Sequence, residues 1–138
     1  MNDTRSRQTL TPEQEAFFDA MIAAALRSEN DSTDDRGGDP LEDNYGPEDI
    51  DEATYARLQR EAVRFVERHA ALIEERDYEA AGHDFWLTRR GHGAGFWDGD
   101  WPLNGDALTA ASKAFGEVDL YIGDDGRIYG YFHKEETC

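Results

Sequence analysis

Residues 83–101 read HDFWLTRRGHGAGFWDGDW and hold all three tryptophans of the chain. Two aromatic pairs, at 85–86 and 96–97, flank a glycine-spaced centre at 91–95. Aromatic side chains suit a pleated strand, and glycines permit a tight turn between strands. The stretch therefore predicts a β-hairpin over about 84–98, with large aromatic side chains from both strands packed in the core.

The C-terminal part of the chain predicts a second hairpin, over 117–132. Apolar residues alternate there with aspartate and tyrosine on both sides of the turn sequence GDDG at 123–126. We expect Phe85 or Trp86, together with Phe96 or Trp97, to be buried beside the inward residues of this second hairpin, Leu120 and Ile128.

Capping signals and apolar spacing predict three helices, over 12–27, 51–76 and 106–115. The sequence TPEQ at 11–14 suits a helix start, and apolar residues recur every three or four positions between 55 and 72. On that long helix, Arg57 and Glu61 are expected to pair on the solvent face. The resulting fold class is α+β, with three helices packed on a small antiparallel sheet made of two hairpins.

Composition limits the classes of partner. The 138 residues are expected to form a single domain, and their formal charge of −17 repels nucleic acid and anionic lipid while attracting basic surfaces. We therefore expect no direct nucleic-acid binding and no membrane association. Cys138 is the single cysteine, which excludes an internal disulfide, and no secretion signal or long apolar run is visible. These features favour a reducing cytoplasm.

The negative charge is concentrated in one part of the chain. Eleven acidic residues against Arg36 alone leave a net charge of −10 over 29–54. Glycines and prolines interrupt this stretch, so it predicts an acidic loop over 29–50, and residues 1–9 are expected to form a flexible N-terminus. The loop is either a solvated linker or a partner-facing patch. For the second case, the expected partner-binding residues are Asp34, Asp35, Asp39, Glu42, Asp43, Glu48 and Asp49.

The central stretch also contains residue types that hold metals. Imidazoles and carboxylates bind zinc, iron or manganese, but no HExxH pattern accompanies them, and no serine nucleophile elbow or phosphate-loop ending is present. We therefore expect no catalytic residue, no metal and no cofactor. A small metal-dependent enzyme stays as an alternative, with a cluster made of His83, Asp84, His92 and Asp98.

Residues 83–101, followed by AFGEVDLYIGDDGRIYGY at 114–131, resemble small acidic proteins of bacteriophages and other mobile elements of bacteria. The resemblance covers about residues 77–131 and depends most on the motifs HDFW and GFWD. It implies an accessory protein that acts in the cytoplasm of a bacterial host, of an anti-CRISPR or other anti-defence type. It assigns no catalytic residue.

Charge and resemblance together favour a non-enzymatic inhibitor. Carboxylates spaced over a surface can stand in for phosphates, so the leading hypothesis is a DNA mimic that binds a basic, nucleic-acid-binding surface of a host defence complex. A CRISPR surveillance complex and a restriction enzyme are examples of such targets. The alternatives are the metal-dependent enzyme above and a plain protein-interaction module whose acidity aids solubility. The sequence contains no signal that indicates an oligomeric state.

Overall fold

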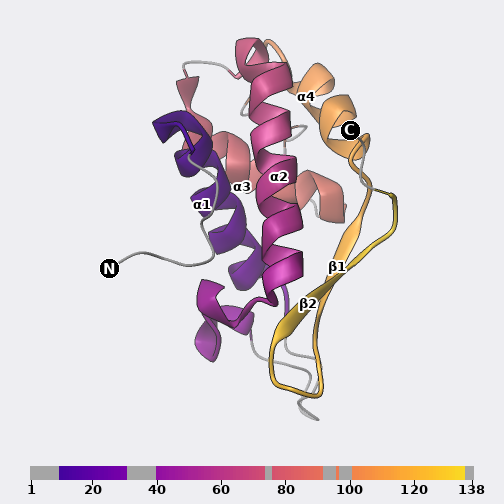
Figure 1. The fold of residues 1–138 in the computed structure, drawn as a ribbon. Helices are drawn as coiled ribbons and strands as arrows, with labels where there is room; N and C mark the ends of the chain where they lie inside the picture. The colour runs from indigo at the N-terminus through magenta and orange to yellow at the C-terminus, as the bar shows by residue number, and fades with distance from the viewer. Residues whose placement is uncertain (1–9, 31–39, 74–75, 92–95, 97–100, 136–138) are drawn as a thin grey trace.

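The computed structural model describes residues 10–30, 40–73, 76–91, 96 and 101–135. Within these ranges the chain forms four α-helices, one antiparallel pair of strands and three short 3-10 turns (Figure 1). The mixed α+β class is therefore confirmed. In chain order the elements are α1 Pro12–Ser28, η1 Leu41–Asp43, η2 Pro47–Asp49, α2 Glu52–His69, η3 Ala70–Leu72, α3 Tyr78–Arg90, α4 Gly105–Lys113, β1 Val118–Ile122 and β2 Ile128–Phe132.

The first two helices begin where their capping residues predict. At α1, Thr11 and Gln14 form a capping box: the Gln14 backbone N–H donates to Thr11 Oγ1 at 3.1 Å, and Thr11 N–H donates to Gln14 Oε1 at 3.0 Å. At α2, Asp51 Oδ2 accepts from Thr54 N–H at 3.1 Å. The prediction for 12–27 is confirmed. The helix predicted over 51–76 is shorter, because it ends at His69 and the chain tightens into η3.

The prediction of a hairpin over 84–98 is wrong for its first strand, since residues 84–90 form the second half of α3. Asp77 begins this helix by accepting from Ala80 N–H at 3.0 Å, and Gly91 ends it in the left-handed conformation at φ 74°. Between these caps, Phe85 and Trp86 lie on the buried face of the helix. The caps and this face outweigh the strand preference of aromatic residues. Residues 92–95 and 97–100 lie outside the described part of the chain.

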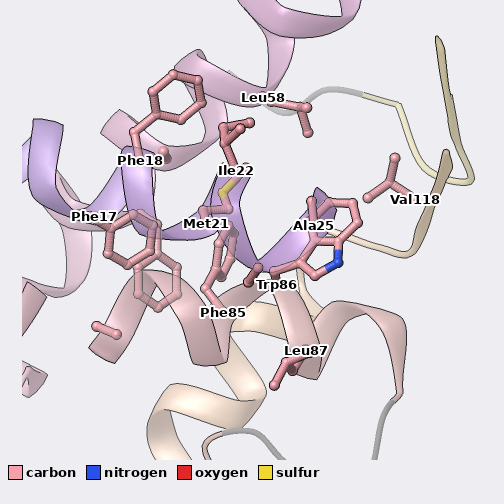
Figure 2. Packing of buried hydrophobic residues seen from close by; sticks show 14 of the residues in the cluster. Phe17, Phe18, Met21, Ile22, Ala25, Leu58, Phe85, Trp86, Leu87 and Val118 are labelled. Carbon is pink, nitrogen blue, oxygen red and sulfur yellow. The ribbon is translucent and has the colours of Figure 1, made fainter. Parts of the chain in front are cut away.

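The core is an aromatic cluster between α1, α2 and α3. The Phe17 ring lies 5.3 Å from that of Phe65 and 5.4 Å from that of Phe85, and the Phe65 and Phe85 rings lie 4.6 Å apart. Figure 2 shows Phe85 and Trp86 directed from α3 toward α1. Phe85, Trp86 and Phe96 are buried, which confirms their expected burial, although Phe85 and Trp86 reach the core from a helix and not from a strand; Trp97 is not among the described residues. Three helices thus share one apolar centre.

The C-terminal hairpin predicted over 117–132 is confirmed as β1 and β2. Leu120 pairs with Gly130 in its register, and Val118 and Ile128 are buried in the core, while Leu120 packs at the core's margin. Strand β2 is fixed to the start of α2, because Asp51 N–H donates to the Ile128 carbonyl at 2.7 Å. The N–H of Gly130 also donates to Thr54 Oγ1 at 3.1 Å. The hairpin therefore lies along α2 (Figure 1), and among the described residues it is the only pair of strands.

Helices α1 and α3 cross at Gly82, where a side chain has no space. A Cβ atom added to Gly82 would lie 2.0 Å from the carbonyl oxygen of Phe17. We expect Gly82→Ala to force the two helices apart and to lower the free energy of unfolding by about 1–3 kcal/mol. Urea denaturation measures this change. Glu79→Ala, at an exposed position of α3, is the matched control. Equal unfolding midpoints for the two variants would contradict this close crossing.

Candidate acidic interaction surface

The part of the acidic segment that the structure describes is folded onto the core. Leu41 and Ile50 are both buried, one at the start of η1 and the other just after η2. The Leu41 N–H donates to the Glu29 carbonyl at 2.9 Å, and Ile50 forms a parallel bridge with Ile128 of β2. The backbone of residues 40–50 is therefore held at two points.

The predicted partner-binding residues differ in their exposure. Glu42, Asp43 and Glu48 are exposed, on η1 and η2. Asp49 is half-buried, and its Oδ2 accepts from Gly46 N–H at 2.8 Å, so it caps η2. We refer to the four together as the acidic surface. The structure leaves three predicted residues undescribed, namely Asp34, Asp35 and Asp39.

Glu29, the first carboxylate of the acidic segment, has a structural role. It is buried, and its Oε2 lies 3.0 Å from Arg90 Nε and accepts from Trp86 Nε1 at 3.3 Å. These contacts fix the end of α1 to the end of α3. Glu29 is therefore unavailable to a partner, unlike the exposed acids that follow it.

Arg90 extends the same network to the hairpin. Its Nη1 lies 2.9 Å from Glu117 Oε2 and 2.5 Å from Asp119 Oδ1. Burial acts to lower the pKa of Arg90, but hydrogen bonds and charge from Glu29 and Asp119 outweigh it, so the pKa is raised. A hydrogen bond from His133, helped by Arg90, lowers the pKa of Asp119. The network joins α1, α3 and β1 through charged groups.

A second group of charges is buried between α2 and α3. Glu61 Oε1 lies 2.6 Å from Arg89 Nη1, and the two residues are only 1% and 4% exposed. Glu61 Oε2 lies 3.2 Å from Arg57 Nε, and Arg89 Nε donates to the Gly116 carbonyl at 2.8 Å. Burial lowers the pKa of Arg89, and Glu61 opposes that change. The predicted pair of Arg57 with Glu61 exists, but its location on the solvent face was wrong for Glu61.

The cluster weighed as a metal site is only partly described. His83 Nδ1 lies 3.0 Å from Asp84 Oδ1, and Trp101 Nε1 donates to Asp84 Oδ2 at 2.7 Å. Asp84 is buried, and both of its oxygens have partners inside the protein. His92 and Asp98 fall in stretches that the structure does not describe. Among the residues that it does describe, histidine, cysteine and carboxylate side chains form no group of three or more that could hold a metal.

Two hollows open along the outer side of α1, and both are lined by Asp19 and Ala23. The first, of about 580 Å³, lies between α1 and the start of α3. The second, of about 370 Å³, lies between α1, the stretch 42–47 and Tyr55. We refer to the two together as the α1 groove. The sequence does not reveal this groove, because its walls come from segments far apart in the chain.

Comparison with known protein families, with curated proteins and with solved structures finds no match to this chain. In the described ranges, no helix combines the length and the apolar character that crossing a membrane requires.

Proposed function

We propose that this protein is a non-catalytic inhibitor whose acidic surface covers a basic, nucleic-acid-binding surface of a partner protein. One observation carries the proposal: Glu42, Asp43 and Glu48 are exposed on short turns that buried residues anchor at both ends. They belong to the stretch 29–54, which has a net charge of −10 out of −17 for the whole chain.

Fixed carboxylates suit this role for two physical reasons. A charged patch steers an oppositely charged partner before contact and so raises the association rate. A backbone that is already ordered also loses less conformational entropy on binding than a free linker loses. A surface that binds phosphates is rich in lysine and arginine, and its charge is complementary to that of the acidic surface.

The resemblance to phage proteins suggests the setting for this activity. We propose a host defence complex in the bacterial cytoplasm, such as a CRISPR surveillance complex or a restriction enzyme, as the partner. Occupation of its nucleic-acid-binding surface would exclude the nucleic acid that the complex must engage. This mechanism requires no cofactor and no catalytic residue in the inhibitor.

The contacts of Asp84 support binding over metal-dependent catalysis. Asp84 is buried, and its oxygens contact His83 Nδ1 and Trp101 Nε1, so its burial is already compensated inside the protein and the residue has a structural role without a metal ion. We therefore retain the acidic inhibitor as the proposed function.

Neutralising the three exposed residues of the acidic surface tests the proposal, and Asp49 is kept because it caps η2. We expect the triple variant Glu42→Gln, Asp43→Asn and Glu48→Gln to associate about tenfold more slowly with its partner, because electrostatic steering is reduced. The partner is first captured from bacterial lysate on the immobilised protein, identified and purified, and association rates are then measured by surface plasmon resonance. The wild-type rate should fall as salt rises through the physiological range, where the Debye length is about 8 Å.

The matched control removes the same charge elsewhere, with Glu67→Gln, Asp124→Asn and Glu135→Gln at other exposed positions. We expect this variant to associate faster than the one with the neutralised acidic surface, and both should keep the wild-type circular dichroism spectrum. A short DNA duplex should compete with the protein for the partner. Equal association rates for the two variants would refute the role of the acidic surface, as would simultaneous binding of DNA and protein to the partner without mutual effect.

A further inference from the structure

The two hollows of the α1 groove differ in chemistry. The first is lined by three carboxylates, Asp19, Asp77 and Glu79, against one arginine, Arg27, and the half-buried imidazole of His83. Burial, and then the nearby charge of Glu15, raise the pKa of Asp19, which means that the ionised form of this carboxyl is less stable here than in water. A cation placed in this hollow would relieve that charge.

The second hollow is largely apolar. Ile22, Leu26 and Tyr55, all buried in the core, contribute to its walls, together with Tyr45 and Pro47. Its acidic lining residues are Asp19, shared with the first hollow, and Glu42, which also belongs to the acidic surface. An apolar side chain placed here would lose water contact against an existing apolar wall.

Two alanines of α1 line the groove. Ala20 lines the first hollow and Ala23 lines both, and Ala23 is exposed. A partner's backbone can approach a helix closely where the helix carries alanine, because no longer side chain projects there. The shared residues Asp19 and Ala23 place the acidic and apolar hollows next to each other, so one short segment could reach both.

We propose that the α1 groove is the docking site for a protruding peptide segment of the partner. The segment places a lysine or arginine in the hollow lined by Asp19, Asp77 and Glu79, and a neighbouring apolar side chain in the hollow lined by Ile22, Leu26 and Tyr55. The inference rests on the proposed function, because that function supplies the partner's basic character. It adds a defined site on α1 and a defined order of side chains, which attraction between charges alone would not specify. Glu42 connects the groove to the acidic surface.

The test uses a synthetic amphipathic helical peptide with lysines along one stripe and leucines along the adjacent stripe, titrated into the isotopically labelled protein. We expect the largest amide shifts in the NMR spectrum at Ala20, Ala23, Tyr45 and Ala80. Ala23→Arg places a long cation on the shared wall, so it should weaken peptide binding by about tenfold or more. Ala110→Arg, at an exposed position on α4, adds the same charge away from the groove and should weaken binding by less than about twofold.

A second peptide, with serine in place of leucine, separates the two hollows. We expect it to bind more weakly than the first peptide and to lose the shift at Tyr45. Equal affinity of the two peptides would overturn the assignment of an apolar side chain to the second hollow and therefore the proposed segment. Failure of the leucine peptide to bind would overturn the docking site as well.

The same titration distinguishes the groove from the acidic surface. Amide shifts confined to residues 42–49, with equal peptide affinity in Ala23→Arg and Ala110→Arg, would overturn the groove and leave the proposed function standing. Conversely, a partner that associates equally fast with both neutralised variants would refute the proposed function, whatever the peptide does. The peptide titration therefore tests the groove, and the association rates of the neutralised variants test the proposed function.

Discussion

Replacing Glu61 by leucine is expected to lower the free energy of unfolding by about 3–5 kcal/mol. The change leaves the Arg89 guanidinium buried without its carboxylate partner, which lies 2.6 Å away in the native protein. The two carbonyl groups that accept from Arg89, those of Phe115 and Gly116, satisfy its hydrogen bonds only in part and supply no full negative charge. Urea denaturation followed by circular dichroism measures the loss.

The double variant Glu61→Leu with Arg89→Met provides the control. It removes both charges and replaces them with apolar side chains, so we expect it to recover much of the stability that the single variant loses. A double variant less stable than Glu61→Leu would show that Arg89 stabilises the protein mainly through its bonds to the two carbonyl groups. A Glu61→Leu variant as stable as the wild type would refute the buried ion pair.

Replacing Phe65 by alanine is expected to cost about 3–5 kcal/mol of stability. This ring is fully buried and lies within 6.2 Å, centroid to centroid, of four other phenylalanine rings, on α1, on α3, at Phe96 and at Phe115. Its removal leaves a cavity at the point where the three long helices meet. Thermal and urea denaturation both report the loss.

Two variants keep this measurement interpretable. Phe65→Leu leaves a smaller cavity and should stay folded even if Phe65→Ala does not, since a domain has a total stability of only about 5–15 kcal/mol. Tyr131→Ala removes an exposed aromatic ring from the outer face of the hairpin and should change stability by less than about 0.5 kcal/mol. The central position of Phe65 would be disproved by a Phe65→Ala variant that unfolds at the same urea concentration as Tyr131→Ala.

Two groups of carboxylates among the described residues differ in their role. Glu29, Glu61 and Asp84 are buried, and each accepts from arginine, tryptophan or histidine inside the fold. Glu42 and Asp43 are exposed on anchored turns. The first group should govern stability and the second should govern association with a partner, so substitutions in the two groups are expected to have separable effects.

The fold class could be predicted from local signals in the sequence. The capping box at Thr11 and Gln14 needs only residues three apart, and the hairpin of β1 and β2 needs only alternation around a turn with Gly126 at φ 80°. Such signals act between neighbours in the chain and can be read without the rest of the protein. Total charge and its concentration in 29–54 are likewise properties of the sequence alone.

The central stretch shows where local interpretation failed. Phe85 and Trp86 favour a strand by propensity, but Asp77 and Gly91 cap a helix that contains them. The preference of an aromatic residue for a strand depends on the surface it packs against. Here that surface is α1, which approaches α3 closely because Gly82 has no side chain. The capping residues Asp77 and Gly91 were the local signals that could have predicted this helix. Packing against α1 is what makes the helix, and not a strand, the stable conformation of these aromatic residues.

The sequence alone determined that the protein is acidic, that its acids gather before the second helix, and that helices and a C-terminal hairpin form the fold. Only the tertiary structure decided which carboxylates are buried with partners and which are displayed, and where α1 leaves a groove beside Asp19. The physical reason is that burial and ion pairing join residues distant in the chain. Glu61 and Arg89 lie 28 residues apart, and no local sequence pattern predicts that they form an ion pair.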